Sequence, residues 1–523
     1  MRKGRLKKLR VFLSLLFFIV IAALFLDFTG TLFVAATHTV LQFQFVPSLV
    51  QFFATFAMAT LGFAVILILT LLFGRIYCST LCPLGTLQDL FTYLSKKLSP
   101  RRKIYKFKKP VNWIRYGIAG LVILSLLTGT ILMVNLLDPY STFGKIFYNT
   151  FRPMLVLVNN ISSKTLTLMD LYWLPPVKWV PVNIAALLLA LGWLVGLAIL
   201  SVTRGRIYCN TVCPVGAVLG IFARYSLFRI QLDKTACNSC GKCSAVCKAE
   251  CIDPKEQSVD FSRCVGCMNC LLPCPDGGVK FRPFWVKDEM KISTFDPAKR
   301  AFIAKTGLLL VASLDTTKAF FPVEKKKETI PATVPINREH PVTPPGAHSQ
   351  PRFNSLCTAC HLCVSACPTQ VLQPTYFLYG MRGFLQPRMD YITNFCNFEC
   401  TLCSEVCPTG ALLPVSKEDK KLLQLGKSYF VKENCIVHTK DTICGACSEH
   451  CPTKAVNMVP YKEKLNIPEV NNNICVGCGA CEYACPTDPK SIYVEGNPLH
   501  LVAEKPKETK IEGEVDYKEE FPF

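Results

Sequence analysis

Residues 237–247 read CNSCGKCSAVC, a C-x2-C-x2-C-x3-C run. In ferredoxins, such a run places three close thiolates on three irons of a [4Fe–4S] cube, and its fourth cysteine ligates a neighbouring cluster. Three further quartets repeat this spacing, and two more have a stretched first gap. The six quartets are Cys237, Cys240, Cys243 and Cys247; Cys264, Cys267, Cys270 and Cys274; Cys357, Cys360, Cys363 and Cys367; Cys396, Cys400, Cys403 and Cys407; Cys435, Cys444, Cys447 and Cys451; and Cys475, Cys478, Cys481 and Cys485. They use 24 of the 29 cysteines and predict six [4Fe–4S] clusters in pairs.

Other uses of these cysteines fit the pattern poorly. Zinc sites separate two C-x2-C pairs by a loop, and disulfide frameworks belong to short secreted domains with an even cysteine count. The sequence Cys357-Thr-Ala-Cys360-His361 matches a haem attachment motif, but a complete quartet already needs both cysteines. Cys251 lies outside the quartets, and we expect a buried small residue rather than a ligand, because free cysteine is among the most often buried residue types.

The composition predicts membrane helices. Half of the residues are hydrophobic, yet the net charge is +21, which is typical of apolar spans with basic flanks. Stretches long enough to cross a bilayer lie at 11–31, 50–73, 114–136 and 182–202. The first could be a signal peptide, but no small-residue cleavage site follows it, so an anchor is favoured.

The basic loops predict the orientation. Residues 1–10, MRKGRLKKLR, hold six Lys or Arg and no acid, and basic residues also follow the second and fourth apolar stretches. By the positive-inside rule, the N-terminus and the segment that follows residue 204 face the cytoplasm of a bacterial inner membrane that the chain crosses several times. No nucleic-acid-binding module accompanies the positive charge, so that class of function is excluded.

An internal repeat lies next to the predicted spans. Residues 71–91, LLFGRIYCSTLCPLGTLQDLF, match residues 202–222, VTRGRIYCNTVCPVGAVLGIF. A pseudo-two-fold relation between the repeats would bring four thiols together, those of Cys78, Cys82, Cys209 and Cys213. Two interpretations stay open. The four cysteines form an extra redox centre, or each motif is a structural turn that caps a helix, with Arg75 and Arg206 at the lipid headgroups.

The predicted fold class is a membrane α-helical bundle of four to five transmembrane helices plus α+β bacterial-type ferredoxin domains. We expect a transmembrane domain with both repeats (1–229), a dicluster ferredoxin domain (230–298), a twin-arginine-like or fifth transmembrane segment (299–322), a proline-rich linker (323–352), a four-cluster ferredoxin domain (353–502) and a charged tail (503–523). In the dicluster domain, the first three cysteines of each run should share a cluster with the last cysteine of the other run. Cys237, Cys240 and Cys243 then join Cys274, and Cys264, Cys267 and Cys270 join Cys247.

These motifs carry a resemblance to known families. Residues 1–290 resemble the NapH membrane ferredoxins, which are related to the NosR and CcoG types, through the two GRxYCxxxCP motifs and the dicluster domain. Residues 299–502 resemble the exported four-cluster ferredoxin NapG, whose pattern suits the gap between Cys435 and Cys444. The resemblance implies that the last four quartets pair from the outside inward. Under that pairing, Cys357, Cys360 and Cys363 join Cys485; Cys475, Cys478 and Cys481 join Cys367; Cys396, Cys400 and Cys403 join Cys451; and Cys435, Cys444 and Cys447 join Cys407.

The resemblance also implies a function, which is electron transfer from the quinone pool to a periplasmic reductase, with the last domain in the periplasm. We therefore expect an electron-transfer subunit, with a quinone or quinol and a redox enzyme or small electron carrier as partners, rather than a stand-alone enzyme with catalytic residues. No G-x-G-x-x-G follows a strand, so no nicotinamide or flavin site is expected. The alternative is a membrane iron–sulfur reductase or maturation factor that delivers electrons to a metal ion or a nascent metalloenzyme.

Overall fold

The structure is a computed structural model that describes residues 2–27, 40–57, 61–98, 105–179, 183–275, 277–285, 334–462 and 464–505. The expected export signal or fifth span at 299–322 lies outside these residues. Part of the expected linker and most of the expected tail also lie outside them. We call residues 2–227 the helical part, residues 228–285 the dicluster unit and residues 334–505 the last domain.

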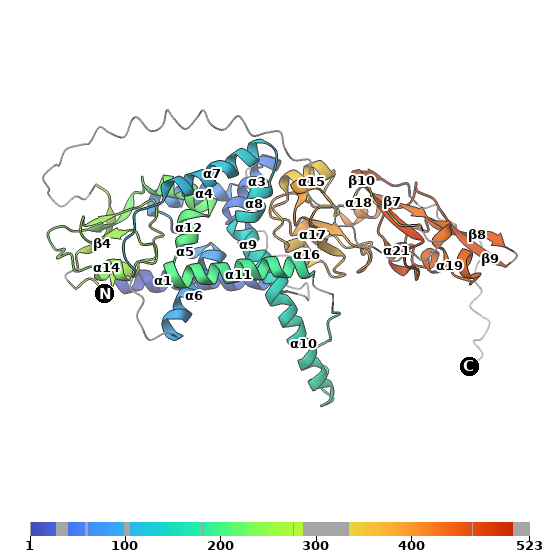
Figure 1. The fold of residues 1–523 in the computed structure, drawn as a ribbon, viewed down its shortest axis with the longest axis horizontal. Helices are drawn as coiled ribbons and strands as arrows, with labels where there is room; N and C mark the ends of the chain where they lie inside the picture. Colours follow the sequence, from blue (N-terminus) through green and yellow to red (C-terminus); the bar gives the residue numbers. More distant parts are fainter. Residues whose placement is uncertain are drawn as a thin grey trace, which may run out of the picture.

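The helical part lies between the dicluster unit and the last domain, which occupy opposite ends of the molecule (Figure 1). Its elements are α1 (Arg2–Leu26), α3 (Phe45–Thr55), α4 (Gly62–Phe73), α5 (Tyr77–Thr80), α6 (Pro83–Leu98), α7 (Asn112–Leu127), α8 (Leu132–Leu137), α9 (Pro139–Ile146), the π-helix η2 (Phe147–Phe151), α10 (Arg152–Thr167), α11 (Ile184–Arg204), α12 (Ile207–Thr211) and α13 (Pro214–Ala223). The helix α1 runs along the long axis from the dicluster unit to the last domain (Figure 1).

Two of the four expected spans are continuous helices. Within α1 and α11, the stretches Gly4–Leu26 and Ile184–Arg204 are long and apolar enough to cross a membrane. The expected span 50–73 is instead divided between α3 and α4, and the expected span 114–136 is divided between α7 and α8 at Gly129, which has a φ of 70°. In the described part of the chain, two helices therefore meet the requirements of a span, and a bundle of four or five spans stays a prediction.

The two sequence repeats fold alike. In each repeat, an apolar helix (α4 or α11) ends at a glycine, a short helix (α5 or α12) carries the first cysteine, and a Cys-Pro step starts the next helix (α6 or α13). The two glycines, Gly74 and Gly205, have φ values of 77° and 62°, a region where other side chains are strained. Proline suits the first position of a helix, so the shared motif prescribes this helix–turn–helix.

The dicluster unit is a small α+β fold. Its strand β1 (Phe228–Leu232) pairs antiparallel with β4 (Val279–Pro283), and β2 (Ile252–Asp253) pairs with β3 (Ser258–Val259). Two short helices, α14 (Lys242–Ala245) and the 3-10 helix η3 (Asn269–Leu271), each carry the third cysteine of a quartet. This arrangement agrees with the expected two-fold pattern of two cysteine runs in one unit.

The last domain has two successive halves. The first contains α15 (Gln350–Leu356), α16 (Leu362–Ala366), β5 (Leu372–Pro374), η4 (Met381–Gly383), β6 (Pro387–Met389), α17 (Leu402–Glu405) and α18 (Lys417–Leu422). The second contains β7 (Leu423–Phe430), η5 (Lys432–Asn434), α19 (Ile436–Lys440), α20 (Ala446–Glu449), β8 (Val456–Lys462), β9 (Leu465–Val470), α21 (Ala480–Ala484) and β10 (Ile492–Val502). The strand pairs are β5–β6, β8–β9 and β7–β10. Helix α16 packs on α17, and α20 packs on α21, so each half is a unit of two cysteine runs.

The dicluster unit and the last domain both contact the helical part directly. At one end, the Arg206 backbone N–H donates to the Lys248 carbonyl at 2.9 Å. At the other end, the Ser365 hydroxyl in α16 donates to the Phe25 carbonyl of α1 at 2.7 Å. One hydrophobic core contains buried residues of all three parts, including Phe143 of α9, Cys270 and Cys360.

Candidate metal centres

In the dicluster unit, the thiols expected to share a cluster lie together. Cys237, Cys240, Cys243 and Cys274 line one cavity, as the crossed pairing predicts. Around the second run, burial raises the pKa of Cys270, and the neighbouring thiols of Cys267, Cys264 and Cys247 raise it further. Four thiolates at each place are the donor set that a [4Fe–4S] cube requires, so both sites fit the group that the sequence predicts.

Cys251 lies beside the second of these sites. It is 1% exposed, and its sulfur is 3.6 Å from the Cys247 sulfur. Its burial agrees with the expectation of a small buried residue. Its closeness to an expected ligand was not predicted.

The outside-inward pairing expected in the last domain is wrong. Cys435, Cys444 and Cys447 line a cavity with Cys485, which had been assigned to the cluster of Cys357. Burial raises the pKa of Cys360 to about 12, and the nearby Cys407 thiol contributes to the shift. The quartets therefore pair with their neighbours in sequence.

The complete neighbour pairing follows from which thiols line one cavity or shift each other's pKa. The sets are Cys357, Cys360 and Cys363 with Cys407; Cys396, Cys400 and Cys403 with Cys367; Cys435, Cys444 and Cys447 with Cys485; and Cys475, Cys478 and Cys481 with Cys451. All 29 cysteines lie in the described residues and are free thiols. Among those residues, no group of three or more His, Cys, Asp or Glu is close enough to hold a single metal ion. A cube needs a wider arrangement, because each thiolate takes its own iron.

The four cysteines of the repeats meet inside the helical part. Cys78, Cys82, Cys209 and Cys213 are each at most 5% exposed, and we call them the membrane quartet. Burial raises the pKa of Cys213, and the other three thiols raise it further. The Gly216 N–H lies 3.4 Å from the Cys213 sulfur at the start of α13, where the helix dipole favours negative charge.

Two arginines cross between the repeats. Arg75 of the first repeat donates to the Cys209 carbonyl at 2.8 Å, and Arg206 of the second donates to the Cys78 carbonyl. The glycines of the motif leave room for them. An added Cβ on Gly216 would lie 2.7 Å from Arg75 Nη2, and one on Gly85 would lie 2.7 Å from Arg206 Nη1. We call this pair of contacts, Arg75 with the Cys209 carbonyl and Arg206 with the Cys78 carbonyl, the clamp. The shared motif supplies both arginines and both glycines.

The crossing arginines are buried, which corrects the interpretation that placed them at the headgroups. Arg75 is 0% exposed and Arg206 is 1% exposed. The remaining contacts of Arg75 are with the Asn210 side chain, the Ser262 carbonyl and, at 3.7 Å, the Cys78 sulfur. None of these partners is a carboxylate. A buried cation without a carboxylate needs another anion nearby, and thiolates or the cluster that they hold would supply one.

A single carboxylate faces three cations on the other side of the clamp. Asp89 of α6 lies 3.0 Å from Arg206, 3.0 Å from Arg10 and 3.1 Å from Lys248. Burial acts to raise the pKa of Asp89, but the three cations outweigh burial and hold it well below its usual range. These ion pairs connect α6 to α1, to the residue that precedes α12 and to the dicluster unit.

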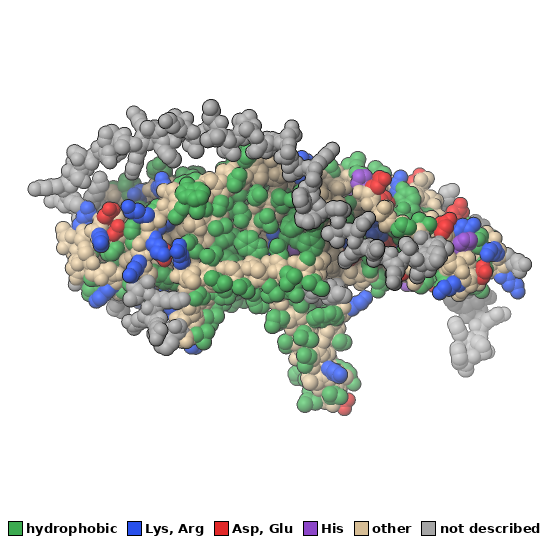
Figure 2. Space-filling view, in the orientation of Figure 1, with side chains coloured by type: hydrophobic (Ala, Val, Ile, Leu, Met, Phe, Trp, Pro, Cys, Tyr) green, Lys and Arg blue, Asp and Glu red, His purple; other side chains and the backbone are tan. Residues whose placement is uncertain are grey.

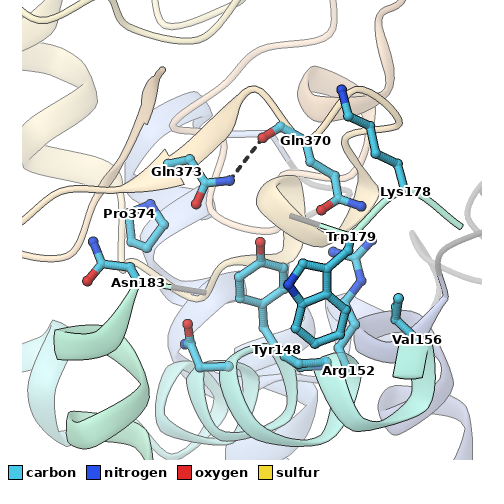
Figure 3. Close-up of a pocket in the computed structure, with 11 residues that line it drawn as sticks. Tyr148, Arg152, Val156, Lys178, Trp179, Asn183, Gln370, Gln373 and Pro374 are labelled. Carbon is cyan, nitrogen blue, oxygen red and sulfur yellow. Dashed lines mark hydrogen bonds between the residues drawn. The ribbon is translucent and has the colours of Figure 1, made fainter. Parts of the chain in front are cut away.

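A small cavity marks the junction with the last domain (Figure 3). Its lining includes Tyr148, Arg152 and Trp179 of the helical part and Gln370 and Gln373 of the last domain. The Gln373 amide donates to the Gln370 carbonyl at 2.9 Å. The cavity holds only about 40 Å³, so the junction is closely packed.

Two family models match the chain at these places. A 4Fe-4S binding domain matches residues 55–102 and 186–234, which contain the membrane quartet. A 4Fe-4S dicluster domain matches residues 356–411 and 442–488, one range in each half of the last domain. Ferredoxin-type domains are therefore present, and the second match agrees with pairing between neighbouring quartets.

Curated relatives are similar to parts of the chain. The putative electron transport protein YccM of Escherichia coli is 26% identical over 42% of this chain and 54% of its own length. The ferredoxin-type protein NapH of Haemophilus influenzae is 25% identical over 43% of this chain and 68% of its own. The methylamine utilization ferredoxin-type protein MauM of Methylophilus methylotrophus is 30% identical over 27% of this chain and 65% of its own. No solved structure matches. The resemblance to NapH-type ferredoxins is confirmed, whereas the fusion to a NapG-type protein stays a prediction.

The neighbour pairing can be tested by combining substitutions. Cys447→Ser and Cys485→Ser each target the same set, so each variant and the double variant should lack at most about four irons, the content of one cube. Cys363→Ser combined with Cys485→Ser should lack about eight. Iron and sulfide analysis of anoxically purified protein measures this. The outside-inward pairing requires the opposite pattern, with about four irons lost in the second double variant and about eight in the first.

The clamp can be tested at the glycine that admits Arg75. In Gly216→Ala, the new Cβ would lie 2.0 Å from the Cys209 carbonyl oxygen, and overpacking of this kind costs about 1–3 kcal/mol. The midpoint of thermal unfolding in detergent should fall. Gly196→Ala in α11 is the matched control, because nothing lies within 4 Å of its added Cβ and alanine favours a helix. Equal unfolding midpoints for both variants would contradict close packing around Gly216.

Proposed function

We propose that this chain is a membrane-bound electron-transfer protein that moves electrons between the quinone pool and a redox partner enzyme of the periplasmic reductase type. The six quartets would hold six [4Fe–4S] clusters, and the membrane quartet would hold a seventh. Bound clusters supply one-electron centres. The names of the relatives support iron–sulfur electron transfer, and the bilayer location makes a quinone an accessible partner.

The membrane quartet is the observation that carries this proposal. Its cysteines belong to the same hydrophobic core as Cys270 of the dicluster unit and Cys360 of the last domain. Arg75, which lies 3.7 Å from the Cys78 sulfur, would offset part of the negative charge that four thiolates would bring. Burial raises the pKa of Cys82, so metal binding, rather than solvent at neutral pH, would remove its proton. A purely structural turn does not require four sulfurs to converge.

The residues between the quartet and the last domain support a continuous connection. The Tyr208 hydroxyl, next to Cys209, donates to the Leu137 carbonyl at 3.1 Å. Leu137 leads into α9, where an added Cβ on Gly144 would lie 2.2 Å from the Cys360 carbonyl oxygen. The short helix α9 therefore packs between the Tyr208 contact and the Cys360 backbone.

Surface chemistry supports a membrane location for the helical part. Hydrophobic side chains cover its visible face, whereas charged side chains gather at both ends of the molecule (Figure 2). Phe12 and Ile19 of α1 are 62% and 63% exposed, and Leu188 of α11 is 64% exposed. Apolar patches of this extent mark membrane or protein contacts. Together with the basic loops, they favour a multi-pass protein of the bacterial inner membrane, with the dicluster unit cytoplasmic and the last domain periplasmic.

The redox role of the membrane quartet predicts an iron count. Seven cubes hold about 28 irons, and Cys82→Ser combined with Cys213→Ser should leave about 24. One reduced-state EPR signal should disappear while the others persist. Thr203→Ser is the control, because this residue is exposed near the second repeat and a serine can keep its hydroxyl bond to the Ile199 carbonyl. Unchanged iron and unchanged signals in the double variant would show that the membrane cysteines are structural.

The proposed topology predicts that a protease outside the cell reaches the last domain but not the dicluster unit. In intact spheroplasts, protease added from outside should cleave the last domain and leave the dicluster unit protected, because the two lie at opposite ends of α1. Opened spheroplasts serve as the control, in which both units are cleaved. Protection of both units in intact spheroplasts would place all the clusters in the cytoplasm and contradict the proposed segment 299–322 as a fifth span.

A further inference from the structure

A cavity of about 770 Å³ lies between α1, α6 and the dicluster unit. Its volume is in the range of ligand-binding sites. Lys7, Arg10, Ser14 and Phe18 line it from one face of α1, and Lys96 lines it from α6. None of these side chains belongs to a cysteine site, so the clusters proposed above do not occupy the cavity.

The residues that line the cavity include more cations than anions. Lys7, Arg10, Lys96 and Lys248 line it, with Asp89 as the acid. Arg10, Lys248 and the adjacent Arg206 already bond to Asp89. In the described part of the chain, no ion pair joins Lys7 or Lys96 to a carboxylate. Burial lowers the pKa of Lys96, and the nearby Lys248 and Lys7 lower it further. Cations gathered in this way favour an anionic ligand.

One end of the cavity is lined by charged side chains and the other end by apolar side chains. The cations Lys7 and Arg10 lie in the first turns of α1, and the apolar lining residues Leu15 and Phe18 lie further along the helix. Leu15 is also 47% exposed, so the apolar end continues onto the outer surface of α1. A ligand with an anionic head and hydrocarbon chains matches this order, whereas free phosphate would leave the apolar wall uncovered.

We propose that this cavity binds the phosphate of an anionic phospholipid from the cytoplasmic leaflet, with its acyl chains along α1. The inference rests on the membrane placement of α1 in the proposed function. Basic pockets between helices at a cytoplasmic face suit such headgroups. Val246 and Asn269, which also line the cavity, adjoin Cys247 and Cys270. The lipid would therefore fasten the dicluster unit to the bilayer beside one of its cluster sites.

Native mass spectrometry of the full chain in detergent tests this site. Added phosphatidylglycerol should be retained and phosphatidylcholine released, and excess inorganic phosphate should not displace the lipid. Lys7→Gln combined with Lys96→Gln should weaken retention about tenfold or more, since each lysine contributes to headgroup attraction. Lys234→Gln combined with Lys255→Gln removes the same charge from exposed positions of the dicluster unit and should change nothing.

Three outcomes would overturn the lipid site. These are equal retention of both lipids, displacement by inorganic phosphate, and retention of a neutral quinone analogue that prevents phosphatidylglycerol from binding. Iron content and membrane fractionation are measured on the same variants. If the protein stays in the membrane with its iron but shows no lipid preference, only this inference fails. If the wild-type chain is not in the membrane fraction, the proposed function fails as well.

Discussion

The burial of Arg75 without a carboxylate partner constrains the rest of this molecule. A guanidinium loses its hydration when it is buried, and the cost is met only where another group carries the opposite charge. The Cys78 sulfur and the Cys209 carbonyl surround Arg75. The reciprocal contact of Arg206 with the Cys78 carbonyl ties the second repeat to the first. Charge balance at this point therefore depends on the four thiols and on what they hold.

The same clamp determines how the ferredoxin units are placed. Arg75 reaches the Ser262 carbonyl of the dicluster unit, and Arg206 shares Asp89 with Lys248. On the opposite side, α9 leads from the Tyr208 contact to Cys360. A hydrocarbon core is about 30 Å thick, a distance too long for one useful electron transfer between soluble clusters. The centre that we propose at the membrane quartet would shorten the longest transfer between clusters.

Much of this arrangement could be predicted from sequence. Cysteine spacing identified the quartets and the crossed pairing of Cys237, Cys240 and Cys243 with Cys274, because the two runs are adjacent in one small unit. The last domain was harder, since four similar runs permit neighbour or outside-inward pairing with identical spacing. The packing of α16 on α17 and of α20 on α21, together with the cavity that Cys435, Cys444 and Cys447 share with Cys485, distinguishes them. Hydropathy likewise located the apolar stretch 114–136 but not its division at Gly129. The positions of Arg75 and Arg206 could not be predicted, because the sequence does not distinguish a buried arginine from one at the lipid headgroups.

Electron passage through the chain is the central claim, and reconstituted vesicles test it most directly. Ferricyanide is trapped inside vesicles that contain the purified chain, and dithionite is added outside. We expect the trapped ferricyanide to be reduced much faster than in protein-free vesicles, without any added quinone, because the proposed clusters would form a path between the two faces of the membrane. Reduction at the protein-free rate, in vesicles whose protein retains its full iron content, would contradict it.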